Sequence, residues 1–283
     1  MKAFLRNIGR FLAYSNLWVG MNVMALTMLT FLQTGTVMIP YLIFSFLGTF
    51  VIYNYARAFE PSEDSLTVAN PIRSWMVHHS TGLLVMTFLA VPVILWIVLG
   101  FSFSSWGWLV AAAVISLAYP LPIQPQKRGG VRYQQGIKIF AIAFVWVIVT
   151  YILPLIESGI TPDLDHALGA TERFLFIIGI TIPFDIRDMK DDDRELSTLP
   201  MILGVGGARF LAIACLVGAM ILLSLRQWYF GAWPLGSFYA QVVALFFAII
   251  LVRGSNDQRD DLYFSFLLEG TSLIWFLAAF IFF

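Results

Sequence analysis

The feature that most constrains this chain is a succession of apolar stretches, each about as long as a helix needs to cross a lipid bilayer. About 20 helical residues span a hydrocarbon core roughly 30 Å thick. Of the 283 residues, 59% are hydrophobic and 12% are charged, which is about half the charged share of an average soluble domain. Lipid rather than water is therefore the expected surrounding of most of this surface.

Each stretch is continuously apolar, without the alternation that a membrane barrel wall would show. We therefore predict an all-α integral membrane protein with nine transmembrane helices in a single transmembrane domain, residues 1–283. The stretches are residues 11–32, 37–53, 81–101, 106–121, 139–156, a weaker one that ends at Phe184, 210–225, 234–252 and 262–283. The sixth must begin near Ala167, so we expect Glu172 and Arg173 at its interfacial end, with their side chains reaching toward water.

The distribution of cations predicts the orientation, because short cytoplasmic loops retain Lys and Arg. With nine spans, 15 of the 17 cations fall in one set of loops, and only Arg173 and Arg226 fall in the other. The N-terminus is thus expected in the cytoplasm and the C-terminus outside, in a multi-pass protein of the cell inner (cytoplasmic) membrane. The basic start lacks a small-residue cleavage site, so we expect the first span to be retained.

The loops on the cytoplasmic side are the longer ones and hold most of the acids. Residues 54–80, 121–138, 185–209 and 253–261 contain 12 of the 17 Asp and Glu residues. We expect these inner loops to form a cytoplasmic cap, and any functional site to open toward the cytoplasm.

The remaining polar features are interpreted more simply. The outer acids Glu157, Asp163, Asp165 and Glu172 are expected to form a solvated rim, as loop charges usually do. The single cysteine, Cys215, can form neither an internal disulfide nor a cysteine metal site. A net charge of zero gives no reason to expect a nucleic-acid partner.

The most informative segment is the acidic run that directly follows the sixth apolar stretch. If the helix continues past Phe184, then Asp185, Asp188 and Asp192 fall within about 60° of one another, because each residue turns by about 100°. Like charges so close repel one another unless a cation lies between them. Mg²⁺ is a natural candidate, since one or two carboxylates together with phosphate oxygens and water commonly hold it. The alternative is a charged helix end that only fixes topology.

The pattern Asp185-x-x-Asp188-x-x-x-Asp192, with Thr198-Leu199-Pro200 and Gly204 after it, closely resembles a known motif. It is similar to the second aspartate-rich motif of the UbiA superfamily of intramembrane prenyltransferases. Those proteins have nine transmembrane helices and carry this motif in the cytoplasmic loop after helix six. The resemblance therefore holds in sequence and in position.

Looser matches extend the resemblance along the whole chain. They are Tyr119-Pro120-Leu121 at the end of the fourth stretch, Gly136-Ile137-Lys138 at the start of the fifth, and Asn70-Pro71-Ile72 in the loop between the second and third. The fold that the resemblance implies is a UbiA-like helical bundle.

The first motif of the family, Asn-Asp-x-x-Asp-x-x-x-Asp, belongs where the second helix meets its cytoplasmic loop. Only Asn54 is retained there, and Tyr55, Ala58 and Ser62 stand where carboxylates belong. The guanidinium of Arg57 could replace a metal ion by forking onto diphosphate oxygens. The alternative for Arg57 is a cytoplasmic anchor of the second helix.

The resemblance implies Mg²⁺-dependent transfer of a prenyl group from a prenyl diphosphate to an aromatic or other hydrophobic acceptor in the lipid phase. Asp188 and Asp192 are then the catalytic pair. The residues implied for the site are Asp185, Asp188 and Asp192 for the metal, and Asn54, Arg57, Tyr119 and Lys138 for the diphosphate head group. For Lys138, too, the alternative is an anchor at the inner face.

Two other functions remain open at the level of sequence. The eroded first motif favours a UbiA-like protein that has lost catalysis and binds isoprenoid lipids. A transporter or channel is less favoured, because no inverted pair of interrupted helices is evident. Glu269 stands alone within the ninth stretch, and its cost in lipid predicts that it faces the bundle interior, where it pairs, titrates or forms a hydrogen bond.

Overall fold

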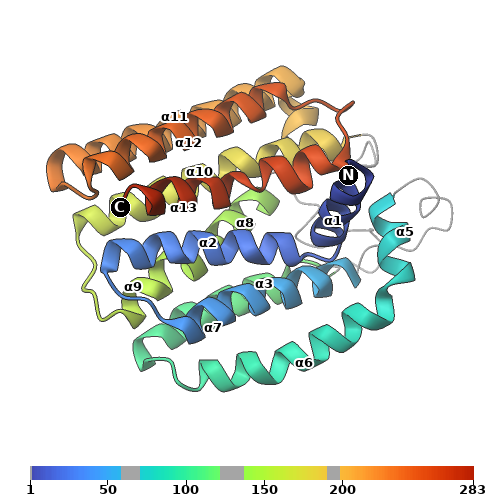
Figure 1. Ribbon diagram of the computed structural model, residues 1–283, viewed down its shortest axis with the longest axis horizontal. Helices are drawn as coiled ribbons and strands as arrows, with labels where there is room; N and C mark the ends of the chain where they lie inside the picture. The colour runs from blue at the N-terminus through green and yellow to red at the C-terminus, as the bar shows by residue number, and fades with distance from the viewer. Residues whose placement is uncertain (1, 59–70, 122–136, 190–197) are drawn as a thin grey trace.

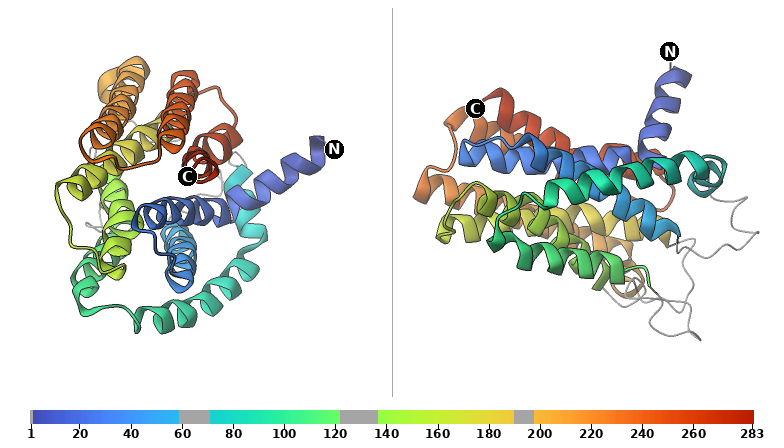
Figure 2. Two further views of the ribbon diagram at one scale, coloured as in Figure 1. Left: turned by 60° about the vertical axis from the view of Figure 1, so that its left-hand side comes forward. Right: turned by 90° about the horizontal axis from the view of Figure 1, so that it is seen from below.

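The protein is a bundle of long helices that lie side by side (Figure 1). The computed structural model describes residues 2–58, 71–121, 137–189 and 198–283, and within these ranges there is no strand. The first helix, α1 (Lys2–Tyr14), lies at one end of the bundle, and the last helix finishes at the other (Figure 1). Figure 2 shows α1 projecting away from the body of the bundle.

Eight helical segments of the described chain are long and apolar enough to cross a membrane. They are α2 (Leu17–Thr34), α3 (Ile39–Ala58), α6 (Ser80–Val98), the continuous segment α8 (Ile137–Val147), η2 (Ile148–Ile152) and α9 (Leu153–Glu157), α10 (Leu164–Asp188), α11 (Leu199–Phe230), α12 (Leu235–Gly254), and the segment η3 (Tyr263–Leu268) and α13 (Thr271–Ile281). A further apolar helix, α7 (Phe103–Ala118), has 16 residues. These segments follow the order of the predicted stretches, so the all-helical membrane fold is confirmed. The count of nine crossings and the side on which each terminus lies stay predictions.

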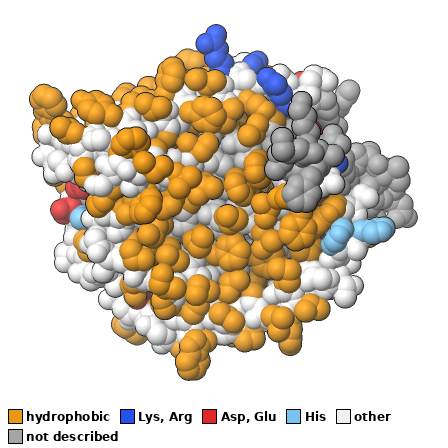
Figure 3. All heavy atoms as spheres, viewed as in Figure 1, with side chains coloured by type: hydrophobic (Ala, Val, Ile, Leu, Met, Phe, Trp, Pro, Cys, Tyr) orange, Lys and Arg blue, Asp and Glu red, His pale blue; other side chains and the backbone are white. Residues whose placement is uncertain are grey.

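The face of the bundle shown in Figure 3 is largely apolar. Large side chains such as Phe88, Trp96, Phe103 and Trp228 are between 77% and 93% exposed. So extensive an exposed apolar area is unfavourable in water and is explained by contact with lipid tails. The chain is a multi-pass membrane protein.

The helix boundaries differ from the predicted stretches in several places. The first stretch, 11–32, is divided between α1 and α2 at Asn16, which has a left-handed backbone with φ of 65°. An apolar run cannot reveal such a break, because the residues on both sides remain apolar. The expected inner loops are also partly helical: α5 (Pro71–His78) lies within 54–80, and α11 begins at Leu199.

Helix α10 is the central element of the bundle, and its close packing against α11 depends on glycine. A Cβ atom on Gly179 would lie 2.7 Å from the Cγ atom of Leu216 and 2.9 Å from the carbonyl oxygen of Ala212. Only a residue without a side chain allows the two helices to approach so closely. This contact holds α10 against α11, and α10 carries polar groups at both of its ends.

The fifth segment is fastened to its neighbours through a π-helical turn. Pro154 has no N–H group, so nearby carbonyls lose a helical donor. Thr30 donates its hydroxyl to the carbonyl of Thr150 at 2.6 Å, and Tyr41 donates to the carbonyl of Val149 at 2.8 Å. Side chains of α2 and α3 thus satisfy the backbone of η2 within the membrane, where no water could do so.

Candidate active site at the end of α10

Two of the predicted carboxylates share one face of the last turn of α10. The helix continues past Phe184 to Asp188, as the spacing predicts. Nζ of Lys138, at the start of α8, lies 2.8 Å from Oδ1 of Asp185 and 3.9 Å from Oδ2 of Asp188. The side chain of Asp185 is 5% exposed, whereas that of Asp188 is 26% exposed. Asp188 is therefore the more accessible carboxylate of the pair.

Arg187, which the sequence predicts only as one of the cytoplasmic cations, is a further member of this cluster. Its Nε donates to Oδ1 of Asp188 at 2.7 Å, and its Nη1 donates to the hydroxyl of Ser265 in η3 at 3.0 Å. The guanidinium also lies over the rings of Phe184 and Phe264. Its position between the two aspartates in the sequence was the signal that could have identified it.

The residues present fit one magnesium ion better than a complete protein-built metal site. Asp192 lies outside the described residues, and among those described no three His, Cys, Asp or Glu side chains come together to hold a metal. Mg²⁺ does not need such a cluster, since it commonly uses one or two carboxylates and completes its shell with phosphate and water oxygens. The partly exposed carboxylate of Asp188 suits this role.

At the position of the first motif, the side chains of Asn54 and Tyr55 form hydrogen bonds between helices. The side-chain amide of Asn54 accepts a hydrogen bond from Nδ2 of Asn16 at 3.0 Å and donates to the carbonyl of Ser15 at 3.4 Å. Tyr55 donates its hydroxyl to the carbonyl of Leu117 in α7 at 3.3 Å. Asn54 thus ties α3 to the break between α1 and α2, and its contact with a substrate stays a prediction.

Arg57 and Tyr119 lie near a second group of polar side chains. Nη1 of Arg57 points to the sulfur of Met76 in α5 at 3.0 Å. Arg57 also interacts electrostatically with Glu269 and with the hydroxyl of Tyr53, and Tyr119, which directly follows α7, interacts with the same hydroxyl. Arg57 and Tyr119 therefore both lie near Tyr53, and Arg57 also lies near Glu269.

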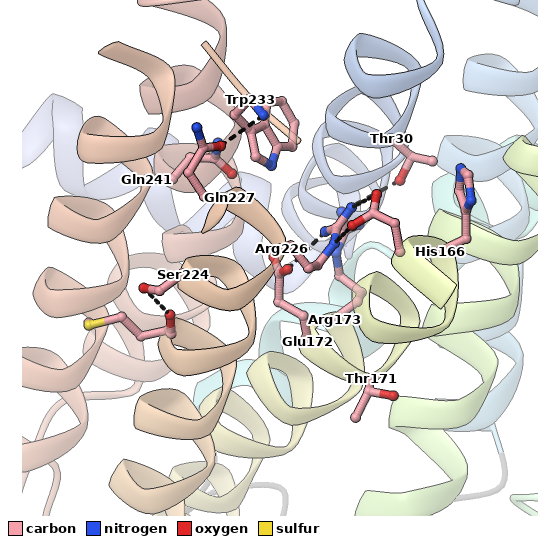
Figure 4. A network of polar contacts seen from close by, with 12 residues as sticks. Thr30, His166, Thr171, Glu172, Arg173, Ser224, Arg226, Gln227, Trp233 and Gln241 are labelled. Atoms are coloured by element: carbon pink, nitrogen blue, oxygen red, sulfur yellow. Dashed lines mark hydrogen bonds and ion pairs between the residues drawn. The ribbon is translucent and has the colours of Figure 1, made fainter. Parts of the chain in front are cut away.

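The prediction of a solvated acidic rim at the opposite end of α10 is wrong for Asp165 and Glu172, which form ion pairs with Arg226. Glu172 is 4% exposed and Arg226 of α11 is 2% exposed. Nε and Nη2 of Arg226 donate to the two carboxylate oxygens of Asp165 at 2.8 and 3.0 Å, and its Nη1 donates to Glu172 at 2.9 Å. Figure 4 shows Arg226, Glu172 and Arg173 pointing toward one another between the helices. Neighbouring spans supply the partners, and the order of the chain does not reveal which spans are neighbours.

The side chain of Arg173 is likewise buried and does not reach toward water. It donates to the carbonyl of Leu26 at 2.7 Å and to the hydroxyl of Thr150 at 3.2 Å. Its guanidinium lies 5.7 Å from the ring centroid of Tyr151 and 5.3 Å from that of Trp275. We refer to Asp165, Glu172, Arg173 and Arg226 as the outer-end cluster.

The other two expected rim acids are used as helix caps. Glu157 accepts hydrogen bonds from the backbone N–H and hydroxyl of Ser102 at 3.0 and 2.9 Å, at the start of α7. Asp163 is exposed and caps α10, where the backbone N–H of His166 donates to it at 3.1 Å and lowers the pKa of its carboxyl group. Asp163 is exposed and Glu157 is partly exposed, so these two acids agree with the expected rim.

Comparison with known proteins places this geometry in a recognised fold. No protein-family model and no curated protein matches the sequence. A UbiA homologue from Archaeoglobus fulgidus, solved with GPP and Mg²⁺, matches with a TM-score of 0.66 at 12% identity, over 96% of this chain and 98% of that chain. A UbiA homologue from Aeropyrum pernix K1 in its apo form matches with a TM-score of 0.61 at 12% identity, over 95% and 96%.

A structure from work on digeranylgeranylglyceryl phosphate synthase in membranes matches with a TM-score of 0.57 at 14% identity, over 98% of both chains. These likenesses extend over nearly the full length of each protein. The expected UbiA-like helical bundle is thus confirmed. This chain has the fold of the UbiA superfamily.

Proposed function

We propose that this chain transfers a prenyl group from a prenyl diphosphate to a hydrophobic acceptor within the membrane. The observation that carries the proposal is the meeting of Asp185 and Asp188 with Lys138 at the end of α10. A UbiA homologue of the same fold has been solved with GPP and Mg²⁺. On the distribution of cations, we place this end of the bundle on the cytoplasmic side of the cell inner membrane.

The chemistry requires stabilisation of negative charge. As the allylic C–O bond breaks, charge accumulates on the leaving diphosphate, and preorganised donors stabilise it most where water is excluded. Lys138 and Arg187 are cations at the described end of α10 that can donate to those oxygens. Mg²⁺ held by Asp188 and Asp192 would add Lewis-acid stabilisation of the same charge. We assign Asp185 to holding Lys138, because the two side chains are 2.8 Å apart.

In the last turn of α3, Arg57 takes the place of the missing first-motif carboxylates. A guanidinium carries a fixed charge and several donors in one plane, which suits diphosphate oxygens. Arg57 lies at the end of α3, where the first motif of the family belongs, and Tyr119 supplies a hydroxyl in the same region. In this proposal Arg57 and Tyr119 bind the diphosphate through hydrogen bonds and charge rather than through a second metal ion.

A specific observation favours one alternative, a protein that binds isoprenoid lipids without catalysis. Tyr55 stands where a carboxylate of the first motif belongs and contacts the carbonyl of Leu117, and Asn54 is bonded to Asn16. Both side chains thus serve packing between helices. A site that lacks the carboxylates of the first motif could bind a prenyl diphosphate without promoting cleavage of its C–O bond.

The test is a transfer assay with the purified protein in lipid nanodiscs, radiolabelled prenyl diphosphates of several lengths, Mg²⁺ and a panel of hydrophobic acceptors. Loss of charge stabilisation in the transition state typically costs about 10²-fold or more in rate. We expect that loss for Asp188→Asn and Asp192→Asn and on removal of Mg²⁺. The matched control is Asp163→Asn, which neutralises an exposed carboxylate at the other end of α10 and should retain the wild-type rate.

Each outcome has one meaning. A wild-type rate in Asp188→Asn would refute the assignment of the site. Binding of prenyl diphosphate by the wild type without product, across the whole acceptor panel, would favour the non-catalytic alternative. Ion flux in proteoliposomes that is indifferent to Asp188→Asn would favour a transporter.

A further inference from the structure

Glu269 is an acid inside the last membrane-spanning segment that the proposed diphosphate site does not use. Its neighbours Leu268 and Gly270 are buried, whereas Glu269 itself is partly exposed. Across the described parts of the chain, no hydrogen bond and no ion pair within 4 Å joins its carboxylate to another residue. Because an acid facing lipid is costly, such a group is expected to face a polar space within the bundle.

The α-helical hydrogen-bond pattern is interrupted around Glu269, and side chains of α2 form hydrogen bonds to the chain on both sides of it. The π-helical η3 ends at Leu268, and α13 begins at Thr271. Nε1 of Trp18 donates to the carbonyl of Phe266 at 3.0 Å, and Oδ1 of Asn22 accepts from the N–H of Leu273 at 3.1 Å. π-helical insertions frequently occur at functional sites, where they redirect a side chain. Here the insertion and its supports fix the position of Glu269.

The charged and titratable neighbours of Glu269 come from two helices, α3 and α10. It interacts electrostatically with Arg57 of α3 and Arg187 of α10, and with the hydroxyl of Tyr53. Arg187 also donates to Ser265, which lies one helical turn before Glu269. Since Arg187 bonds directly to the proposed metal ligand of α10, Glu269 lies one turn deeper in the bundle than the proposed head-group site.

We propose that Glu269 accepts a hydrogen bond from an uncharged hydroxyl or phenol group of the acceptor and takes its proton during transfer. This inference rests on the proposed function and narrows its acceptor class. In the step, the C–O bond of the prenyl diphosphate breaks and its electron pair leaves with the diphosphate. The acceptor oxygen forms a new bond to the freed carbon, and the proton of that oxygen moves to the carboxylate of Glu269. A carboxylate favours an O–H donor and repels an acceptor that is itself an anion.

The decisive variant is Glu269→Gln, which preserves shape and removes the proton acceptor. A positioned general base typically contributes about 10²- to 10⁴-fold, so we expect transfer to a hydroxyl acceptor to fall by at least about 10²-fold. Binding of radiolabelled prenyl diphosphate should change by less than about twofold, and Glu269→Asp should recover part of the rate. The rise of the rate with pH in the wild type should be absent from Glu269→Gln.

The matched control is Ser272→Ala, which removes a buried hydroxyl group from the adjacent helix α13. It should leave transfer and its pH profile unchanged. If Glu269→Gln keeps the wild-type rate and pH profile, or loses prenyl diphosphate binding together with transfer, the inference is overturned.

A binding measurement separates this inference from the proposed function. Without any prenyl diphosphate, the wild type should bind a long-chain alkylphenol at least about tenfold more tightly than its methyl ether, because a hydrogen bond to a charged group is among the stronger ones. Glu269→Gln should lose that preference. If no acceptor is turned over but the preference is present and lost in the variant, the transfer proposal fails while Glu269 remains the hydroxyl-binding group. Equal binding of both compounds by the wild type would overturn the assignment of Glu269.

Discussion

The outer-end cluster gives the sharpest test of the structure, through replacement of Arg226. This side chain is 2% exposed and contacts both Asp165 and Glu172. Arg226→Gln removes the cation that is bonded to Glu172, whose carboxylate is 5% exposed, and leaves Arg173 as a more distant positive charge. Breaking a buried pair from one side costs about 3–5 kcal/mol, because an uncompensated charge stays buried. We expect Arg226→Gln to lower the free energy of unfolding by about that amount.

A double-mutant cycle tests whether the loss comes from the pair. Glu172→Gln alone leaves Arg226 bonded to Asp165, so it should cost less than Arg226→Gln. The double variant has no unpaired Glu172 charge, and it should be more stable than the sum of the single losses by about 1–3 kcal/mol.

The assay is reversible unfolding in mixed micelles by titration with sodium dodecyl sulfate, followed by tryptophan fluorescence. Arg253→Gln is the control, because Arg253 is exposed and surface substitutions usually change stability by less than about 0.5 kcal/mol. Additive losses in the cycle, or a loss below about 1 kcal/mol for Arg226→Gln, would refute the reasoning.

Two further predictions use the same titration. Gly169→Ala would place Cβ 1.9 Å from Oη of Tyr151, so we expect a loss of about 1–3 kcal/mol from overpacking; Gly206→Ala, which meets nothing within 4 Å, should lose none. Asp163 has a lowered pKa because the backbone N–H of His166 donates to its carboxylate. Its contribution to stability is therefore present above the ordinary pKa of about 4 and is lost as the pH falls through the lowered value. Asp163→Ala should lack this acid-dependent loss, and an identical pH dependence in both proteins would contradict the assignment.

The helical class and the order of the membrane segments could be predicted because both depend on local properties of the chain. Apolar length sets the spans, and the helical turn of about 100° per residue sets the shared face of Asp185 and Asp188. The left-handed break at Asn16 could not be predicted in this way, since the side chain that Asn16 contacts there, Asn54, lies 38 residues away in the sequence.

The partners of buried charges were harder to predict than their existence. Rules for membrane topology count cations and assign Arg173 and Arg226 to loops, without asking which acids lie beside them. The pairing of Arg226 with Glu172 depends on α10 and α11 packing together across 54 residues of sequence. For Glu269, the cost of a charge in lipid predicts an inward direction, but only the packing of α3 and α10 identifies Arg57 and Arg187 as its neighbours.

The charged groups at the two ends of α10 differ in how deeply they are buried, and this difference bears on function. In the outer-end cluster, Arg226 is bonded to two carboxylates and is almost completely buried, so the protein itself satisfies these charges. At the other end, Lys138 and Asp188 are about a fifth to a quarter exposed. A diphosphate that draws Lys138 and Arg187 toward its oxygens would leave the carboxylate of Asp188 to a divalent cation. In the proposed site, anion and metal therefore favour each other's binding, and by linkage the coupling is the same in either order.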